Sequence, residues 1–145
     1  MFRGALLIAL LGCAGGVDAQ EHPFAGHWTA NIGKSRLSPS YPFQSGTLDV
    51  SVAADTITMA SVVINAGKEQ RAAETFRTDG TETSGTINRD VRLVAKFLDP
   101  HVLATIAKKG GAVLALVTYE VSADGKTMFV RSSGSVEHVV VFERR

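Results

Sequence analysis

The sequence of 145 residues has only one cysteine and four prolines, and it lacks any apolar run long enough to cross a membrane. A disulfide framework needs paired cysteines, so the fold must be stabilised by packing. The longest apolar stretch, Ala5–Leu11, is far shorter than the roughly 20 residues of a membrane-spanning helix. No proline follows Pro100, which permits long uninterrupted strands in the last third of the chain.

An excess of charge of either sign is also absent. The chain has 15 Lys and Arg against 14 Asp and Glu, and the two signs alternate along it. We therefore expect no nucleic-acid partner and no attraction to an anionic membrane. The hydrophobic content of 45% is enough to bury one core in a chain of this length.

The first 19 residues resemble a signal peptide. Arg3 is followed by the apolar stretch Ala5–Leu11, and Val17–Ala19 has the small residues of a cleavage site. Cleavage after Ala19 would leave residues 20–145 as a single domain in the periplasm or outside the cell. An alternative is a lipoprotein anchored through Cys13, because Leu10–Cys13 resembles a lipobox, although such a leader is short for a secretory signal.

Alternation of apolar and polar residues with period two predicts an all-β protein. About nine or ten short strands are expected, with turn signals such as Asn65–Lys68, Lys108–Gly111 and Ala123–Lys126 between them. A single helical turn is expected at Gly33–Leu37, and a bulge near Ala60 and Ser61. Because closure removes exposed sheet edges, the pattern favours an antiparallel up-and-down β-barrel of about 8 to 10 strands, with a two-sheet sandwich as the alternative.

Motifs for catalysis and for metal or cofactor binding are missing. No two of His22, His27, His101 and His138 have the spacing of metal ligands in one element, and no phosphate loop, dinucleotide fingerprint or Gly-x-Ser-x-Gly is present. Glu74 and Glu120 lie in expected strands, and Glu120 is expected in solvent. The sequence therefore predicts no enzyme, no metal and no cofactor, and a haem bound through an inward His138 is a remote alternative.

A small ligand inside a barrel would need apolar walls and a few polar anchors. Arg131 is the expected anchor, because it shares its strand face with Phe129 and lies on the strand after Tyr119. Phe97, on the expected strand Arg92–Leu98, completes the predicted ligand-binding set. The only tryptophan, Trp28, is expected to close the barrel floor.

The opening Phe24-Ala25-Gly26-His27-Trp28 resembles the Phe-x-Gly-x-Trp start of calycins, the lipocalin and fatty-acid-binding-protein superfamily. Gly26–Asn31, Lys34-Ser35, Ser38-Pro39 and the last three strands resemble small secreted bacterial lipocalin-like proteins, mostly uncharacterised. The resemblance implies that Arg144, or else Arg145, packs across Trp28. The sequence differs from fatty-acid-binding proteins at one site. Those proteins bind the fatty-acid carboxylate with an Arg-x-Tyr pair on the last strand, and here Val140 and Phe142 occupy those two positions.

The sequence thus predicts a secreted or periplasmic lipocalin-like protein that binds a small hydrophobic ligand without catalysis. An envelope module with a filled core, serving a partner protein through its surface, is the alternative. A haem-binding or enzymatic barrel is the third possibility. Nothing in the sequence indicates the ligand or the oligomeric state.

Overall fold

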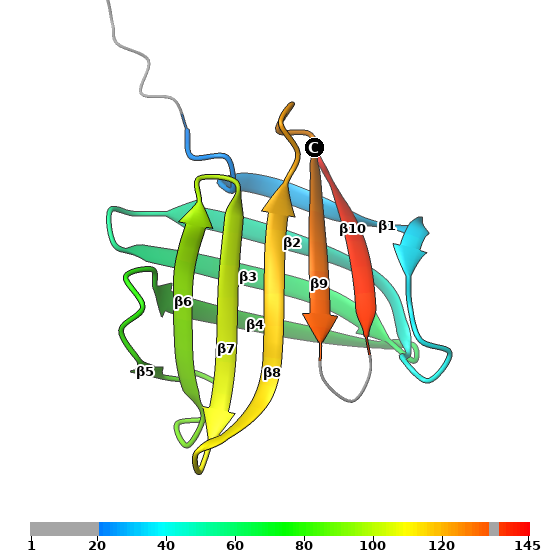
Figure 1. Ribbon diagram of the computed structural model, residues 1–145. Coiled ribbons are helices and arrows are strands. Elements are labelled where there is room, and N and C mark those ends of the chain that lie inside the picture. The colour runs from blue at the N-terminus through cyan, green and yellow to red at the C-terminus, as the bar shows by residue number, and fades with distance from the viewer. Residues whose placement is uncertain (1–20, 134–136) are drawn as a thin grey trace, which may run out of the picture.

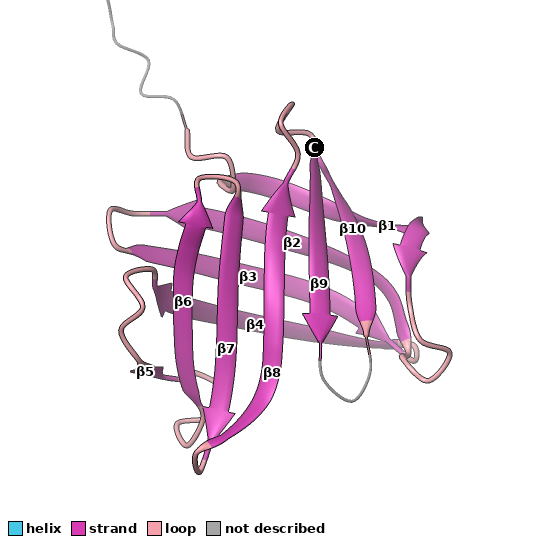
Figure 2. Ribbon diagram, in the orientation of Figure 1, coloured by secondary structure: helices cyan, strands magenta, loops and turns pink. Residues whose placement is uncertain are grey.

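The computed structural model describes residues 21–133 and 137–145, and all their regular structure is β (Figure 2). The expected signal peptide, its cleavage site after Ala19 and Cys13 lie outside the described residues. No helix in the described part is long and apolar enough to cross a membrane. The ten strands are β1 (Gly26–Arg36), β2 (Phe43–Val52), β3 (Thr56–Asn65), β4 (Lys68–Arg77), β5 (Thr83–Ser84), β6 (Arg92–Asp99), β7 (Val102–Lys109), β8 (Ala112–Val121), β9 (Thr127–Ser133) and β10 (His138–Arg144).

The strands form one antiparallel sheet in the order β4-β3-β2-β1-β10-β9-β8-β7-β6-β5. Consecutive strands pair except β4 and β5, which are the two ends of this order, and β1 also pairs with β10, which joins the two halves of the sheet. The halves face each other with their strands crossing, so the sheet forms a nearly closed barrel (Figure 1). The prediction of an up-and-down antiparallel barrel is therefore confirmed.

Period-two alternation places one face of each strand in the interior. On β2 the buried side chains include Leu48 and Val50, and on β3 they are Ile57 and Met59. The core extends across the barrel to side chains on the later strands, including Leu103, Val121, Met128 and Phe142.

Trp28 is 1% exposed in the core and donates a hydrogen bond of 3.0 Å from Nε1 to the carbonyl of Phe24. The Arg144 guanidinium carbon lies 4.3 Å from the centroid of the indole. The same guanidinium donates hydrogen bonds to the carbonyls of Pro23, Ala25 and Gly125. Arg144 thereby ties the lead-in segment and the β8–β9 turn to the tryptophan.

Two local expectations are wrong. The segment expected as a helical turn continues β1 to Arg36, and the irregularity lies instead in the pairing with β10 between Asn31 and Arg36. No bulge interrupts β3 at Ala60, because its pairing with β4 is continuous from Thr56 to Asn65. The apparent shift arises because the alternate face of β3 also carries apolar residues, Val62 and Ile64.

The hairpin turns lie where the sequence predicts them. Ala66 and Gly67 join β3 to β4 with φ values of 48° and 77°, and Gly110 and Gly111 join β7 to β8 with 56° and 81°. Two successive positive φ angles are typical of type I′ turns, whose twist matches that of the flanking strands. These turns set the pairing of consecutive strands.

Candidate ligand-binding site

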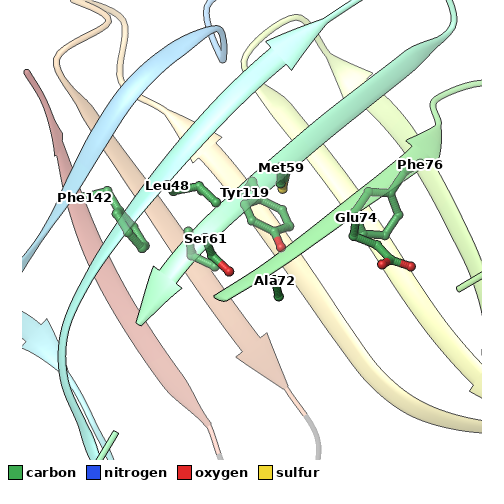
Figure 3. A pocket seen from close by; sticks show the side chains of 9 residues that line it. Leu48, Met59, Ser61, Ala72, Glu74, Phe76, Tyr119 and Phe142 are labelled. Carbon is green, nitrogen blue, oxygen red and sulfur yellow. The ribbon is translucent and has the colours of Figure 1, made fainter. Parts of the chain in front are cut away.

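A cavity of about 230 Å³ lies inside the barrel, between the two halves of the sheet. Strands from both halves contribute side chains to its wall (Figure 3). Six of the nine lining residues are apolar: Leu48, Met59, Ala72, Phe76, Val130 and Phe142. The other three, Ser61, Glu74 and Tyr119, are polar.

Strand alternation explains why these residues meet. Ala72, Glu74 and Phe76 are alternate residues of β4, so they share the face that looks across the barrel to Tyr119 on β8. In Figure 3, Phe142 lies toward one end of the cavity, whereas Phe76 and Glu74 lie toward the other. The cavity therefore has an apolar end and an end with a carboxylate.

The Glu74 carboxylate has two unlike oxygens. Oε1 accepts a hydrogen bond of 2.7 Å from the backbone N–H of Thr86, in the segment that follows β5. Oε2 is buried and has no hydrogen-bond partner among the described residues. A buried acceptor without a hydrogen-bond partner lowers the stability of the fold, so Oε2 of Glu74 is an unsatisfied hydrogen-bond acceptor.

Tyr119 brings its phenol into the same wall. Burial raises the pKa of Tyr119 to about 12, and the neighbouring Thr105 hydroxyl opposes this rise only in part. Since the ordinary tyrosine pKa is about 10, the phenol stays neutral at every physiological pH. Its ligand-binding role, expected from the sequence, stays a prediction.

Arg131 and Phe129 do not line the cavity, which corrects the expectation that they share a site with Tyr119. Tyr119 pairs with Val130, so the residues on either side of Val130 point to the opposite face of the sheet. There Arg131 forms an ion pair of 3.1 Å with Glu120, with both side chains about half exposed, and lies over the Phe129 ring. Only Tyr119 and Val130 reach the cavity from these two strands.

Phe97 packs against the core beside the lead-in segment that precedes β1. Its ring centroid lies 5.6 Å from that of Phe24 and 4.8 Å from that of His22, and it is not among the cavity-lining residues. Burial is the main cause that lowers the pKa of His22, and the nearby His101 lowers it further. This aromatic cluster lies next to Trp28, which bonds the carbonyl of Phe24, and does not line the cavity.

His138 is also outside the cavity wall. Its Nδ1 accepts a hydrogen bond of 3.2 Å from the backbone N–H of Ser38, and its ring stacks on Tyr41 at a centroid distance of 4.1 Å. Both contacts hold the β1–β2 connection against β10. In the described part of the chain, no group of three His, Cys, Asp or Glu side chains could hold a metal ion.

No known protein-family model and no curated protein sequence matches this chain. Several solved structures do match it. A mutant of the fluorescent protein UnaG matches with a TM-score of 0.65 and 18% identity, covering 85% of this chain and 96% of that one. A Schistosoma mansoni fatty acid binding protein in complex with arachidonic acid matches with a TM-score of 0.60 and 16% identity over 85% and 96%.

A third structure, described as the REP1-NXSQ fatty acid transporter, matches with a TM-score of 0.60 and 14% identity, covering 83% of this chain and 95% of that one. At these identities the likeness concerns the fold. The chain therefore has the calycin-like barrel fold of fatty-acid-binding proteins, as its opening motif and strand pattern predict.

Proposed function

We propose that this protein binds a small, mainly apolar molecule inside its barrel and does not act on it chemically. The observation that carries the proposal is the interior cavity, which has six apolar lining residues and three polar ones. Ligand sites commonly combine an apolar wall with a few polar groups that fix orientation. The barrels with the same fold include proteins whose descriptions name fatty acid binding or transport, and this supports the proposal.

The cavity volume limits the size of the ligand. A cavity of about 150 Å³ can hold a benzene molecule, whereas sites for drug-sized ligands are about 300 to 1,000 Å³. At about 230 Å³, this cavity suits a molecule with one or two rings or a short branched chain. Naphthalene is therefore a suitable neutral probe.

A substitution that fills the cavity tests the proposal. Ala72 lines the cavity, while its neighbour Ala73 on the same strand is exposed. Ala72→Phe is expected to weaken naphthalene binding at least tenfold, because the added ring occupies the ligand's volume; that is a loss of about 1.4 kcal/mol or more. Isothermal titration calorimetry of naphthalene with both proteins measures the change.

Ala73→Phe is the matched control, because it adds the same ring to the same strand on the outer face. It is expected to bind naphthalene like the wild type. Equal weakening by both substitutions, or none by Ala72→Phe, would place the naphthalene outside the cavity. Failure of the folded wild type to bind naphthalene would instead favour the interaction module, for which exposed Val113, Leu114 and Leu116 on β8 offer an apolar surface.

The arrangement of the carboxylates supports binding without catalysis. Glu74 faces the cavity, whereas Glu120 lies on the outer face with Arg131. A pair of carboxylates in one cavity, as in acid–base hydrolysis, is thus not formed by these two residues.

Export from the cytoplasm is part of the proposal, supported by the leader-like residues 1–19. Expressed at full length in a bacterium with two membranes, the chain is expected in the periplasm with Gln20 as its first residue. Intact-mass measurement of the cell fractions tests this. A full-length cytoplasmic protein, or a lipid attached to Cys13, would contradict it.

A further inference from the structure

Two hydroxyl groups belong to the cavity wall, one from each half of the sheet. Ser61 lies on β3, and Tyr119 lies on β8. Ser61 pairs with Leu48 on β2 and with Ala72 on β4, and all three line the cavity, so its side chain shares their inward face. Tyr119 lies on the inward face of β8, two residues before the buried Val121. The two hydroxyls therefore reach the interior from facing walls.

Both side chains border open space inside the barrel. Each faces inward yet is only partly buried, so its accessible surface lies toward the cavity. In Figure 3 the oxygen of Tyr119 points toward Ala72, and the oxygen of Ser61 is turned toward the same part of the cavity. Among the described residues, neither oxygen belongs to the buried atoms without a partner, unlike Oε2 of Glu74. A bound molecule can therefore meet both hydroxyls.

The Tyr119 hydroxyl is available as a hydrogen-bond donor at neutral pH. Burial raises the pKa of Tyr119 to about 12, so the phenol keeps its proton. The hydroxyl of Thr105 beside it donates its own proton to the carbonyl of Val117 over 3.3 Å. Because a hydroxyl proton rotates to suit its partner, the protons of Tyr119 and Ser61 can turn toward an acceptor on a ligand.

The lining offers no positive charge to a ligand. Among the described residues that form it, none is a lysine, arginine or histidine, and Glu74 is an acid. The arginine expected to serve as an anchor, Arg131, lies on the outer face and is paired with Glu120. An anion in this cavity would lose its hydration without gaining a cation, which is costly. The polar part of the wall therefore suits an uncharged group.

We propose that the hydroxyls of Tyr119 and Ser61 form the polar subsite of the cavity and select uncharged molecules that carry a hydrogen-bond acceptor, such as a ketone, on an apolar ring system. The rings lie against Leu48 and Phe142, and the carbonyl oxygen accepts the O–H of Tyr119, with Ser61 as the second donor. This inference rests on the proposed function, because it needs an occupied cavity.

Two probes of nearly the same shape isolate the hydrogen bond. They are acetonaphthone and isopropenylnaphthalene, in which a CH₂ group replaces the carbonyl oxygen. Because water hydrates the ketone better than the alkene, their affinities for the wild type alone do not report the hydrogen bond. The ratio of their two dissociation constants is therefore compared between protein variants, by isothermal titration calorimetry at neutral pH.

Tyr119→Phe removes the phenol oxygen and keeps the ring. We expect it to weaken acetonaphthone binding about fivefold relative to isopropenylnaphthalene, the size of one hydrogen bond between neutral groups. Ser61→Ala is expected to change the same ratio about threefold. Tyr41→Phe is the matched control, because Tyr41 is the other tyrosine of the chain and stacks on His138 outside the cavity wall. It is expected to leave the ratio unchanged.

Nuclear magnetic resonance of acetonaphthone labelled with ¹³C at the carbonyl reports the hydrogen bond directly. A carbonyl carbon resonates at a higher frequency when its oxygen accepts a hydrogen bond than when its surroundings are apolar. We expect the signal of the bound ketone at a higher frequency in the wild type and in Tyr41→Phe than in Tyr119→Phe. Altered packing without a lost hydrogen bond would not move the signal in this direction.

The outcomes separate the inference from the proposed function. If isopropenylnaphthalene binds but the ratio and the carbonyl signal are the same in the wild type and Tyr119→Phe, the inference is overturned while ligand binding stands. Tighter binding of naphthoate than of acetonaphthone to the wild type overturns it too. If no probe binds to the folded wild type, the proposed function itself fails. Should Tyr119→Phe not fold, the carbonyl signal of the wild-type complex, compared with that of the ketone in cyclohexane, decides alone.

Discussion

Replacing Trp28 with alanine is expected to lower the free energy of unfolding by about 3 to 5 kcal/mol. The indole is 1% exposed, and its removal leaves a cavity in the core. The carbonyl of Phe24 loses a hydrogen-bond donor, and the Arg144 guanidinium loses the ring over which it lies. Urea denaturation followed by far-ultraviolet circular dichroism measures the change.

Trp28→Phe separates the contributions. A phenylalanine ring restores much of the apolar volume but cannot donate to the Phe24 carbonyl. We expect it to cost about 1 to 2 kcal/mol, since it leaves an unsatisfied acceptor and a partial void. A loss below about 1 kcal/mol for Trp28→Ala would contradict the assignment of Trp28 to the core.

Gly26→Ala is expected to destabilise the protein by about 2 to 4 kcal/mol. Gly26 has a φ of +131°, a conformation that L side chains rarely adopt. A Cβ at this position would also collide with Nη1 of Arg144, whose guanidinium holds the carbonyls of Pro23 and Ala25. The substitution thus adds backbone strain and displaces the cation from its acceptors.

Gly111→Ala provides the matched control for Gly26→Ala. Its φ is +81°, yet no atom lies within 4 Å of the added Cβ, so only the backbone strain remains. We expect a loss of about 1 to 2 kcal/mol. The account of Arg144 is wrong if Gly26→Ala costs no more than Gly111→Ala, as measured by thermal or urea unfolding.

The barrel could be predicted from the sequence because its information is local. Alternating residues define the two faces of each strand, and turn residues such as Gly110 and Gly111 join consecutive strands. The helical turn expected at Gly33–Leu37 is wrong, because the polar residues of this segment show no period-two alternation that would have indicated a strand. Pairing with β10 nevertheless extends β1 to Arg36.

The candidate site was only partly predictable, because it depends on register across hairpins. A shift of one residue in the β8–β9 pairing would exchange the faces of β9, and only the observed pairing of Tyr119 with Val130 excludes Arg131 from the interior. Glu74 carried a usable signal, since it shares its strand face with Phe76, the large apolar residue of β4. The cavity itself follows from how the two halves of the sheet cross, which no local pattern encodes.

Methionine methyl groups offer the most direct test that the ligand lies inside the barrel. Met59 lines the cavity, whereas Met128 is fully buried in the core and does not line it. In a protein labelled with ¹³C at the methionine methyl groups, titration with naphthalene is expected to shift the Met59 signal, with nuclear Overhauser contacts from the ligand to Met59 and little change at Met128. Binding that leaves Met59 unchanged, with ligand contacts only to exposed residues such as Val113 and Leu114, would contradict an interior site.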